Sequence, residues 1–140
     1  MLRQARTSHK RNLPRTGAIH AVELLLLLPI ILALILGMVE YSMILSIDQQ
    51  LAVASREGAR VAAQGGSASE AEAAARLVLG PGSVGLESVV TSQLTDVSGD
   101  PVLVRVVIAD AATVVPNLLR FAGFSIKDKP LAGAAIMRRE

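Results

Sequence analysis

The sequence contains no cysteine and no tryptophan, and aromatic residues make up only 2% of its 140 residues. Without cysteine the chain has no disulfide, no thiol chemistry and no cysteine-based metal site. With so few aromatics, a core has to be built from valine, leucine, isoleucine and alanine. That is a thin core for a stand-alone globular domain, and 140 residues leave room for one domain.

Acidic residues are absent before Ala18, which makes the start of the chain a purely basic leader. Its basic residues are Arg3, Arg6, Lys10, Arg11 and Arg15. Residues 19–140 contain nine Lys and Arg against twelve Asp and Glu, so their net charge is −3, whereas the whole chain has +2. The net positive charge of the whole chain therefore comes from the leader. It does not indicate a nucleic-acid partner, because such a partner would need a basic face on the folded part.

The combinations of residues that usually carry catalysis are also missing. Both histidines, His9 and His20, precede the part of the chain expected outside the membrane. No Ser–His arrangement, HExxH motif or phosphate-binding glycine loop is present. We therefore expect no enzyme activity, no catalytic residues, no metal and no cofactor.

A long apolar run follows the leader. Residues 19–39 are interrupted only by His20 and Glu23, and about 20 apolar residues suffice to span a bilayer as a helix. The basic leader should stay in the cytoplasm, which leaves the C-terminal part outside. Two alternatives are a secretory signal peptide, with residues 24–36 as its apolar region, and a plain uncleaved anchor. The signal peptide is disfavoured because residues 37–42 lack a small-x-small cleavage site.

The helix is expected to continue beyond the membrane. Glu40 and Tyr41 mark the outer interface, where tyrosine is common. Apolar residues then recur with helical spacing at Ile44, Ile47, Leu51, Ala54, Ala59 and Ala62. Gly65 and Gly66 end the pattern, so one helix of about 70 Å is predicted over residues 19–64. Pro29 inside it is either a simple kink or a flexible point.

The remaining residues predict a small head of mixed structure. A short helix is expected from Ser67 or Ser69 to Leu79, and strands over residues 86–94, 102–108 and 131–137. Pro116 opens a second short helix that Gly123 ends, after which residues 124–126 resume extended structure. The predicted fold class is α+β, with a long N-terminal transmembrane helix leading into an antiparallel sheet. The predicted parts are a leader (1–18), a transmembrane helix (19–39), its outer extension (40–66) and the head (67–140).

Several stretches in a fixed order make the sequence more specific. They are residues 17–23 (GAIHAVE), 28–29 (LP), 37–41 (GMVEY), 54–60 (ASREGAR) and 132–140 (AGAAIMRRE). Together they resemble the TadE-like family, the minor pseudopilins of tight-adherence (Flp-type) pilus systems. The strongest likeness is at residues 54–60, which match the family's AAREGAR signature. The resemblance covers residues 17–64 well and the rest loosely, and it implies a fold like that of a type IV pilin.

The resemblance implies that a prepilin peptidase cleaves the leader. The cut falls between Ala18 and Ile19 if Glu23 is the fifth mature residue, and after Gly17 if Glu23 is the sixth. Glu23 would then pair with the new α-amine of a neighbouring subunit, a role that also explains a costly carboxylate at the mouth of a membrane segment. Without such a neighbour, it is an interfacial glutamate that reaches the headgroups. His20 departs from the apolar residue usual in the family.

A polar cluster on the outer part of the helix is a candidate docking surface. It consists of Arg56, Glu57, Gly58 and Arg60. Glu57 and Arg60 are three residues apart and can pair, whereas Arg56 and Arg60 share a face and repel each other unless a partner intervenes. Gly58 costs about 1 kcal/mol in mid-helix but allows another element to approach closely. The cluster is either a solvated face or a surface on which the head or another pilin docks.

The predicted function is that of a membrane-anchored minor pseudopilin that assists assembly of a pilus used in adhesion. The implied partners are the membrane, other pilins or pseudopilins of the same system, the prepilin peptidase and the inner-membrane assembly platform. The implied location is the bacterial inner (cytoplasmic) membrane, crossed once, with the head extracytoplasmic. The protein either stays there to prime assembly or enters the pilus. The alternatives are an uncleaved single-pass envelope adaptor and a pseudopilin of a related secretion system.

Overall fold

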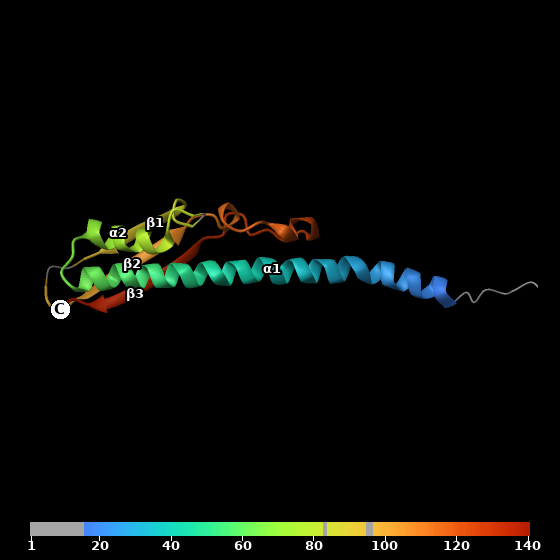
Figure 1. Ribbon diagram of the computed structural model, residues 1–140, viewed down its shortest axis with the longest axis horizontal. Coiled ribbons are helices and arrows are strands. Elements are labelled where there is room, and N and C mark those ends of the chain that lie inside the picture. The colour runs from blue at the N-terminus through green and yellow to red at the C-terminus, as the bar shows by residue number, and fades with distance from the viewer. Residues whose placement is uncertain (1–15, 83, 95–96) are drawn as a thin grey trace, which may run out of the picture.

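One continuous helix, α1, runs along almost the whole length of the molecule (Figure 1). The computed structural model describes residues 16–82, 84–94 and 97–140, with side chains from residue 20 onward. The basic residues of the leader, all within residues 1–15, lie outside this part. α1 spans Thr16–Ala63, 48 residues, and is therefore about 72 Å long. It continues through Pro29 without a break in its assignment as helix.

The two halves of α1 differ in what covers them. From residue 20 to residue 32 every described side chain is exposed, and most of these side chains are apolar. Further along, one stripe of α1 is covered by the rest of the chain, with the three- and four-residue spacing of a helix face. Its members are Gly37, Glu40, Ile44, Ile47, Leu51, Ala54, Gly58 and Ala62. The outer part of the predicted apolar pattern therefore faces the head.

A second helix, α2 (Ala68–Leu79), follows a short turn after α1. Ser67 caps it: its side chain accepts a hydrogen bond from the Glu70 backbone, while the Glu70 carboxylate accepts one from the Ser67 backbone at 2.7 Å. This reciprocal arrangement satisfies amide groups that the first turn leaves without partners. Ala71, Ala75 and Leu79 form the buried face.

Three antiparallel strands form one sheet in the order β1-β2-β3: β1 (Ser88–Gln93), β2 (Pro101–Ile108) and β3 (Leu131–Arg138). In the middle strand β2, buried residues alternate with more exposed ones, as expected for a sheet with one covered face. Its buried side chains are Val102, Val104, Val106 and Ile108. They pack with Leu51, Ala54 and the alanines of α2 in a single core.

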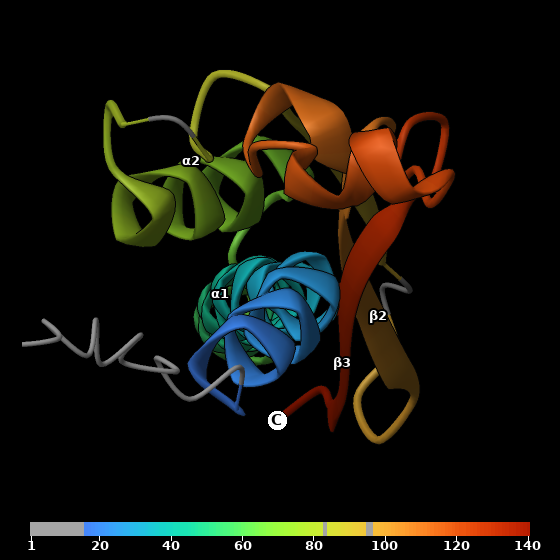
Figure 2. The same cartoon turned by 90° about the vertical axis from the view of Figure 1, so that its right-hand side faces the viewer.

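The end-on view in Figure 2 shows α2 and the sheet on different sides of α1. α1 packs against both, so the outer half of α1 is part of the head's core. The C-terminus of the chain is held to the rest of the head by backbone hydrogen bonds. The Glu140 amide donates to the Ala63 carbonyl oxygen (2.9 Å), and the Arg139 amide donates to the Asp100 carbonyl oxygen (3.0 Å). The fold is therefore α+β, with a long apolar N-terminal helix leading into a small antiparallel sheet, as the sequence predicted.

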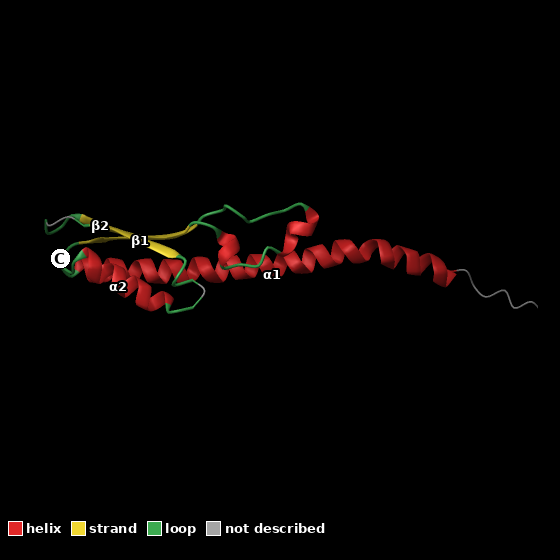
Figure 3. Cartoon of the chain, turned by 90° about the horizontal axis from the view of Figure 1, so that it is seen from above, coloured by secondary structure: helices red, strands yellow, loops and turns green. Residues whose placement is uncertain are grey.

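The connection between β2 and β3 folds back along α1, away from the sheet (Figure 3). It contains two short 3₁₀ helices, η1 (Ala111–Thr113) and η2 (Leu118–Ala122). Asp110 closes its base, because one carboxylate oxygen accepts hydrogen bonds from the amides of Ala112 (2.9 Å) and Asp128 (3.0 Å). Gly123 ends η2 in the left-handed conformation, at the residue where the sequence predicted a stop.

Residues 124–126, which were expected to resume extended structure, form no strand and have no sheet partner. They lie beside η2, where the Ser125 hydroxyl accepts hydrogen bonds from the Asn117 side chain (2.9 Å) and from the Lys127 amide (3.2 Å). These local bonds hold the segment beside η2 without strand pairing.

Candidate functional site

The predicted processing residues lie at the start of α1. The backbone of Gly17, Ala18 and Ile19 is helical, and α1 begins at Thr16, before both predicted cut positions. Both bonds therefore lie in the first turn of the helix, where the first amide groups have no partner within the helix.

Glu23 lies one turn further along and is open to its surroundings. Its side chain is 68% exposed, and the carboxylate oxygen Oε2 is 3.6 Å from Nδ1 of His20, which is 79% exposed. The two are three residues apart, so they share a face of α1. A carboxylate placed this way is accessible to a group on another chain.

The surface around Glu23 is apolar. A shallow groove along α1 is lined by Leu24, Leu28, Ile31, Leu32 and Ile35. Among the described residues, one helix is long and apolar enough to cross a membrane, and this groove lies on it. The N-terminal half of α1 thus offers an apolar surface to lipid or to other helices, consistent with a protein that crosses the membrane once.

The predicted docking surface, which consists of Arg56, Glu57, Gly58 and Arg60, has one buried residue and three charged residues on the outside. Gly58 is buried where α2 and β2 meet α1. A Cβ atom added at Gly58 would lie 2.9 Å from the carbonyl oxygen of Ala71 and 3.0 Å from Cγ1 of Val104. The chain's own head therefore occupies this close-approach position.

The charged members of the cluster lie on the outside. Arg60 donates two hydrogen bonds to the Glu57 carboxylate, one of them from Nε at 3.0 Å, and a further one to Gln64 at 3.4 Å. The hydrogen bond from Arg60 lowers the pKa of Glu57, and the same bond raises the pKa of Arg60. Arg56 is exposed. The structure thus pairs Glu57 with Arg60 and leaves their outer faces accessible to solvent.

Glu40 is the residue that sequence reasoning missed, because it was taken only as a marker of the membrane boundary. Its side chain is buried, with 4% of its surface exposed. Oε2 accepts hydrogen bonds from the amides of Leu118 (2.9 Å) and Leu119 (3.0 Å) at the start of η2. The signal that could have found it is its spacing: Glu40 lies on the same helix face as Ile44, Ile47 and Leu51.

The arrangement as a whole supports anchoring and docking. Within residues 20–82, 84–94 and 97–140, no group of three or more His, Asp or Glu side chains converges in a way that could hold a metal ion. The accessible features are an apolar helix with one carboxylate, a charged pair over a buried glycine, and a head fixed to the same helix.

Comparison with known proteins identifies one family. Residues 20–60 match the family described as TadE-like protein, and no curated protein or solved structure matches the chain. The matched segment covers most of α1, including Glu23, Glu40 and the cluster around Gly58. Such a segment supports a place for the chain in a tight-adherence (Flp-type) pilus system. Residues 20–60 of this chain are thus similar to the TadE-like family.

Proposed function

We propose that the protein is a minor pseudopilin that assists assembly of a tight-adherence pilus and is cleaved by a prepilin peptidase before Ile19. The observation that carries the proposal is the exposed carboxylate of Glu23 on a bare apolar helix, one turn from the proposed new N-terminus. The TadE-like match over residues 20–60 gives the system in which it would act. The protein sits in the bacterial inner membrane, with the leader in the cytoplasm and the head outside.

Glu23 acts in this proposal by pairing with the α-amine of another subunit. An ionised carboxylate in hydrocarbon is costly, and a positive partner offsets much of that cost. Cleavage supplies such a partner on every mature subunit. Because apolar helices attract each other only weakly in lipid, one ion pair between them can set their relative height.

The outer cluster supports a second contact with a sibling pilin or pseudopilin. Arg56 and the Glu57–Arg60 pair are accessible on α1, outside the apolar span. A partner carboxylate could bind Arg56 or Arg60 there, while Gly58 fixes the chain's own head beneath them. We take this surface as the docking site for a sibling pilin or pseudopilin. The assembly platform would bind the protein below this surface.

The first test is the N-terminus of the protein purified from its own membranes. Intact mass and N-terminal sequencing should show a chain that begins at Ile19. A chain that begins at Ala18 would still support cleavage by the peptidase, with Glu23 as the sixth mature residue. If residues 1–18 were still present in cells whose peptidase cleaves other pilins, processing would be excluded.

A second test separates processing from assembly. Glu23→Gln removes the charge but keeps the shape, so the protein should be cleaved and inserted normally while the number of pili per cell falls several-fold. Glu87→Gln, which changes an exposed glutamate of the head, is the matched control and should leave pili unchanged. Normal piliation with Glu23→Gln would exclude the assembly role of this carboxylate.

An uncleaved single-pass envelope adaptor is the alternative, because α1 already begins at Thr16 and would cross the membrane without cleavage. It predicts that Ala18 and Glu23 can both be replaced without a change in mass or function. A pseudopilin of a related secretion system would be processed in the same way. It would differ in its phenotype, since deletion would reduce secretion and leave pili and adhesion intact.

A further inference from the structure

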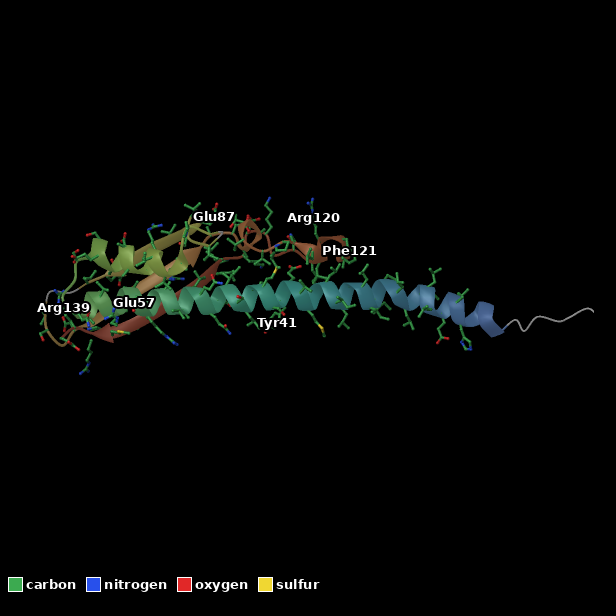
Figure 4. The ribbon with its side chains drawn as sticks, in the orientation of Figure 1. Tyr41, Glu57, Glu87, Arg120, Phe121 and Arg139 are labelled. Carbon is green, nitrogen blue, oxygen red and sulfur yellow. The ribbon has the colours of Figure 1, made fainter. Side chains whose placement is uncertain are left out.

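The segment around η2 exposes both phenylalanines of the chain. Phe121 is 61% exposed and Phe124 is 68% exposed. Arg120 is exposed beside them and points away from α1, whereas Phe121 lies at the end of η2 (Figure 4). Large apolar side chains gathered on a surface mark contacts with a membrane or with another protein. For brevity, we refer to residues 118–126 as the foot.

The foot is held at a defined position along α1. The Glu40 carboxylate binds the amides of Leu118 and Leu119, and a Cβ atom added at Gly37 would lie 3.3 Å from Cδ1 of Leu119. A groove between α1 and the foot is lined by Gly37, Tyr41, Ile44, Leu119, Phe124 and Ile126. The foot therefore lies level with Gly37 and Glu40.

The apolar run of α1 fixes where this level falls in a membrane. A hydrocarbon core about 30 Å thick takes roughly 20 helical residues. Counted from Ile19, the span ends near Met38; counted from Leu24, after the charged Glu23, it ends near Met43. In both registers Gly37 lies within the hydrocarbon and Glu40 lies near its outer boundary. The foot, packed against these two residues, must then be at the outer boundary as well.

The chemistry of the foot fits that boundary. Apolar rings can enter the acyl region there, while the exposed Arg120 can reach headgroup phosphates with its long side chain. The burial of Glu40 also has a reason at this depth. Two amide hydrogen bonds satisfy a carboxylate that would otherwise face hydrocarbon, and the same bonds attach the foot.

We propose that residues 118–126 form a lipid-binding foot, which inserts Phe121 and Phe124 into the outer leaflet of the membrane that α1 crosses. The head is thereby held upright on the bilayer by two contacts, α1 and the foot. The inference rests on α1 crossing the membrane, which is part of the proposed function, and it does not depend on a role in pilus assembly.

Because the chain has no tryptophan, single tryptophan variants report the depth of one position at a time. The full chain would be placed in phosphatidylcholine–phosphatidylglycerol vesicles that contain lipids brominated on their acyl chains. Phe121→Trp and Phe124→Trp should show blue-shifted emission and quenching by lipids brominated near the headgroup. Gln93→Trp, on β1 far from the foot, should emit as in water and be quenched by iodide instead. Leu32→Trp, in the middle of the span, should be quenched by deeply brominated lipids.

Three results would overturn the inference. Emission from Phe121→Trp and Phe124→Trp that matches Gln93→Trp would put the foot in water. A blue shift that the brominated lipids do not quench, and that disappears as protein is diluted in lipid, would mean that a second copy covers the foot. Absence of quenching at Leu32→Trp would show that α1 does not cross the bilayer. Each of these is distinct from a failure of the pilus role, which is read from pili on cells.

Discussion

Two carboxylates on the same helix have different surroundings, so different groups can reach them. Glu23 is exposed beside His20, whereas Glu40 is buried and bound to two backbone amides. An exposed carboxylate on an apolar surface is available to another molecule. A buried one that is satisfied within the chain holds its own fold together. Sequence alone could not separate them, because the amides that bind Glu40 come from residues 78 and 79 positions away.

Replacing Glu40 should release the foot from α1. Glu40→Ala leaves the amides of Leu118 and Leu119 without an acceptor, at a cost of about 1–3 kcal/mol. Glu40→Gln keeps an acceptor oxygen and should cost less. Hydrogen exchange measured by mass spectrometry should show faster exchange at residues 118–119 in the alanine variant, with the sheet unchanged. Exchange at residues 118–119 of Glu40→Ala as slow as in the unsubstituted protein would mean that the carboxylate does not hold the foot.

At Gly133, β3 comes close to the backbone of α1. A Cβ atom added there would lie 2.5 Å from the carbonyl oxygen of Leu51 and 2.8 Å from the amide nitrogen of Ala52. Both neighbours are backbone atoms, so they can move away only if the strand separates from the helix.

We therefore expect Gly133→Ala to destabilise the head by about 1–3 kcal/mol, the usual cost of overpacking. Gly82→Ala is the matched control, because a Cβ atom at Gly82 meets open space. Urea denaturation followed by circular dichroism in detergent checks the pair. A stability loss in Gly133→Ala no larger than in Gly82→Ala would contradict the close contact.

At the scale of elements, regular helices and strands were predictable, and the connection between β2 and β3 was only partly so. α1, α2 and the three strands follow local periodicity, and Ser67 marks the start of α2 as a cap does. Pro116 and Gly123 indicated a short helix, which the structure shows as η2. Its position beside α1 had no local signal, since it depends on Glu40 and Gly37.

The cap of α2 should be sensitive to acid. The hydrogen bond from the Ser67 backbone, followed by that from the Ser67 hydroxyl, lowers the pKa of Glu70 below its ordinary value of 4.5. A lowered pKa means that the ionised carboxylate stabilises the folded state above pH 4.5, and that this contribution is lost as the pH falls through the folded value. The pKa of Glu57 is lowered as well, so the effects of the two carboxylates have to be separated by mutation.

Amide exchange in α2 should therefore speed up less below pH 4.5 in Glu70→Gln than in the unsubstituted protein. Ser67→Ala should instead increase amide exchange in the first turn of α2 roughly fivefold at neutral pH. Exchange at residues 68–72, measured as a function of pH, checks both. An unchanged acid profile in Glu70→Gln would assign the pH dependence to other groups.

At the scale of the whole molecule, the head has no core without α1. Leu51, Ala54 and Ala59 of α1 are fully buried among the valines of β2 and the alanines of α2. The shortage of aromatic residues makes this contribution necessary, because small side chains fill a core only when a helix passes through it. The composition predicted a thin core. The face of α1 that completes this core was indicated only by the periodic apolar pattern beyond Tyr41.

Leu51→Ala should consequently destabilise the entire head, by about 2–5 kcal/mol, since it opens a cavity between α1 and the sheet. Val53→Ala, two residues away on the exposed side of α1, should cost much less. Limited proteolysis in detergent distinguishes them: the Leu51→Ala head should be cut faster throughout residues 67–140. If both variants resisted proteolysis equally, the head would be stable independently of α1.

The position of β3 has a consequence for how the protein is made. β3 follows every other described element in the chain, yet it pairs with the central strand β2 and packs on α1 at Leu51. During synthesis, the inner surfaces of α1 and β2 therefore lack part of their cover until residues 131–138 have been made. The head can close only after this last strand is available, and a chain stalled before it would expose its valines to chaperones and proteases.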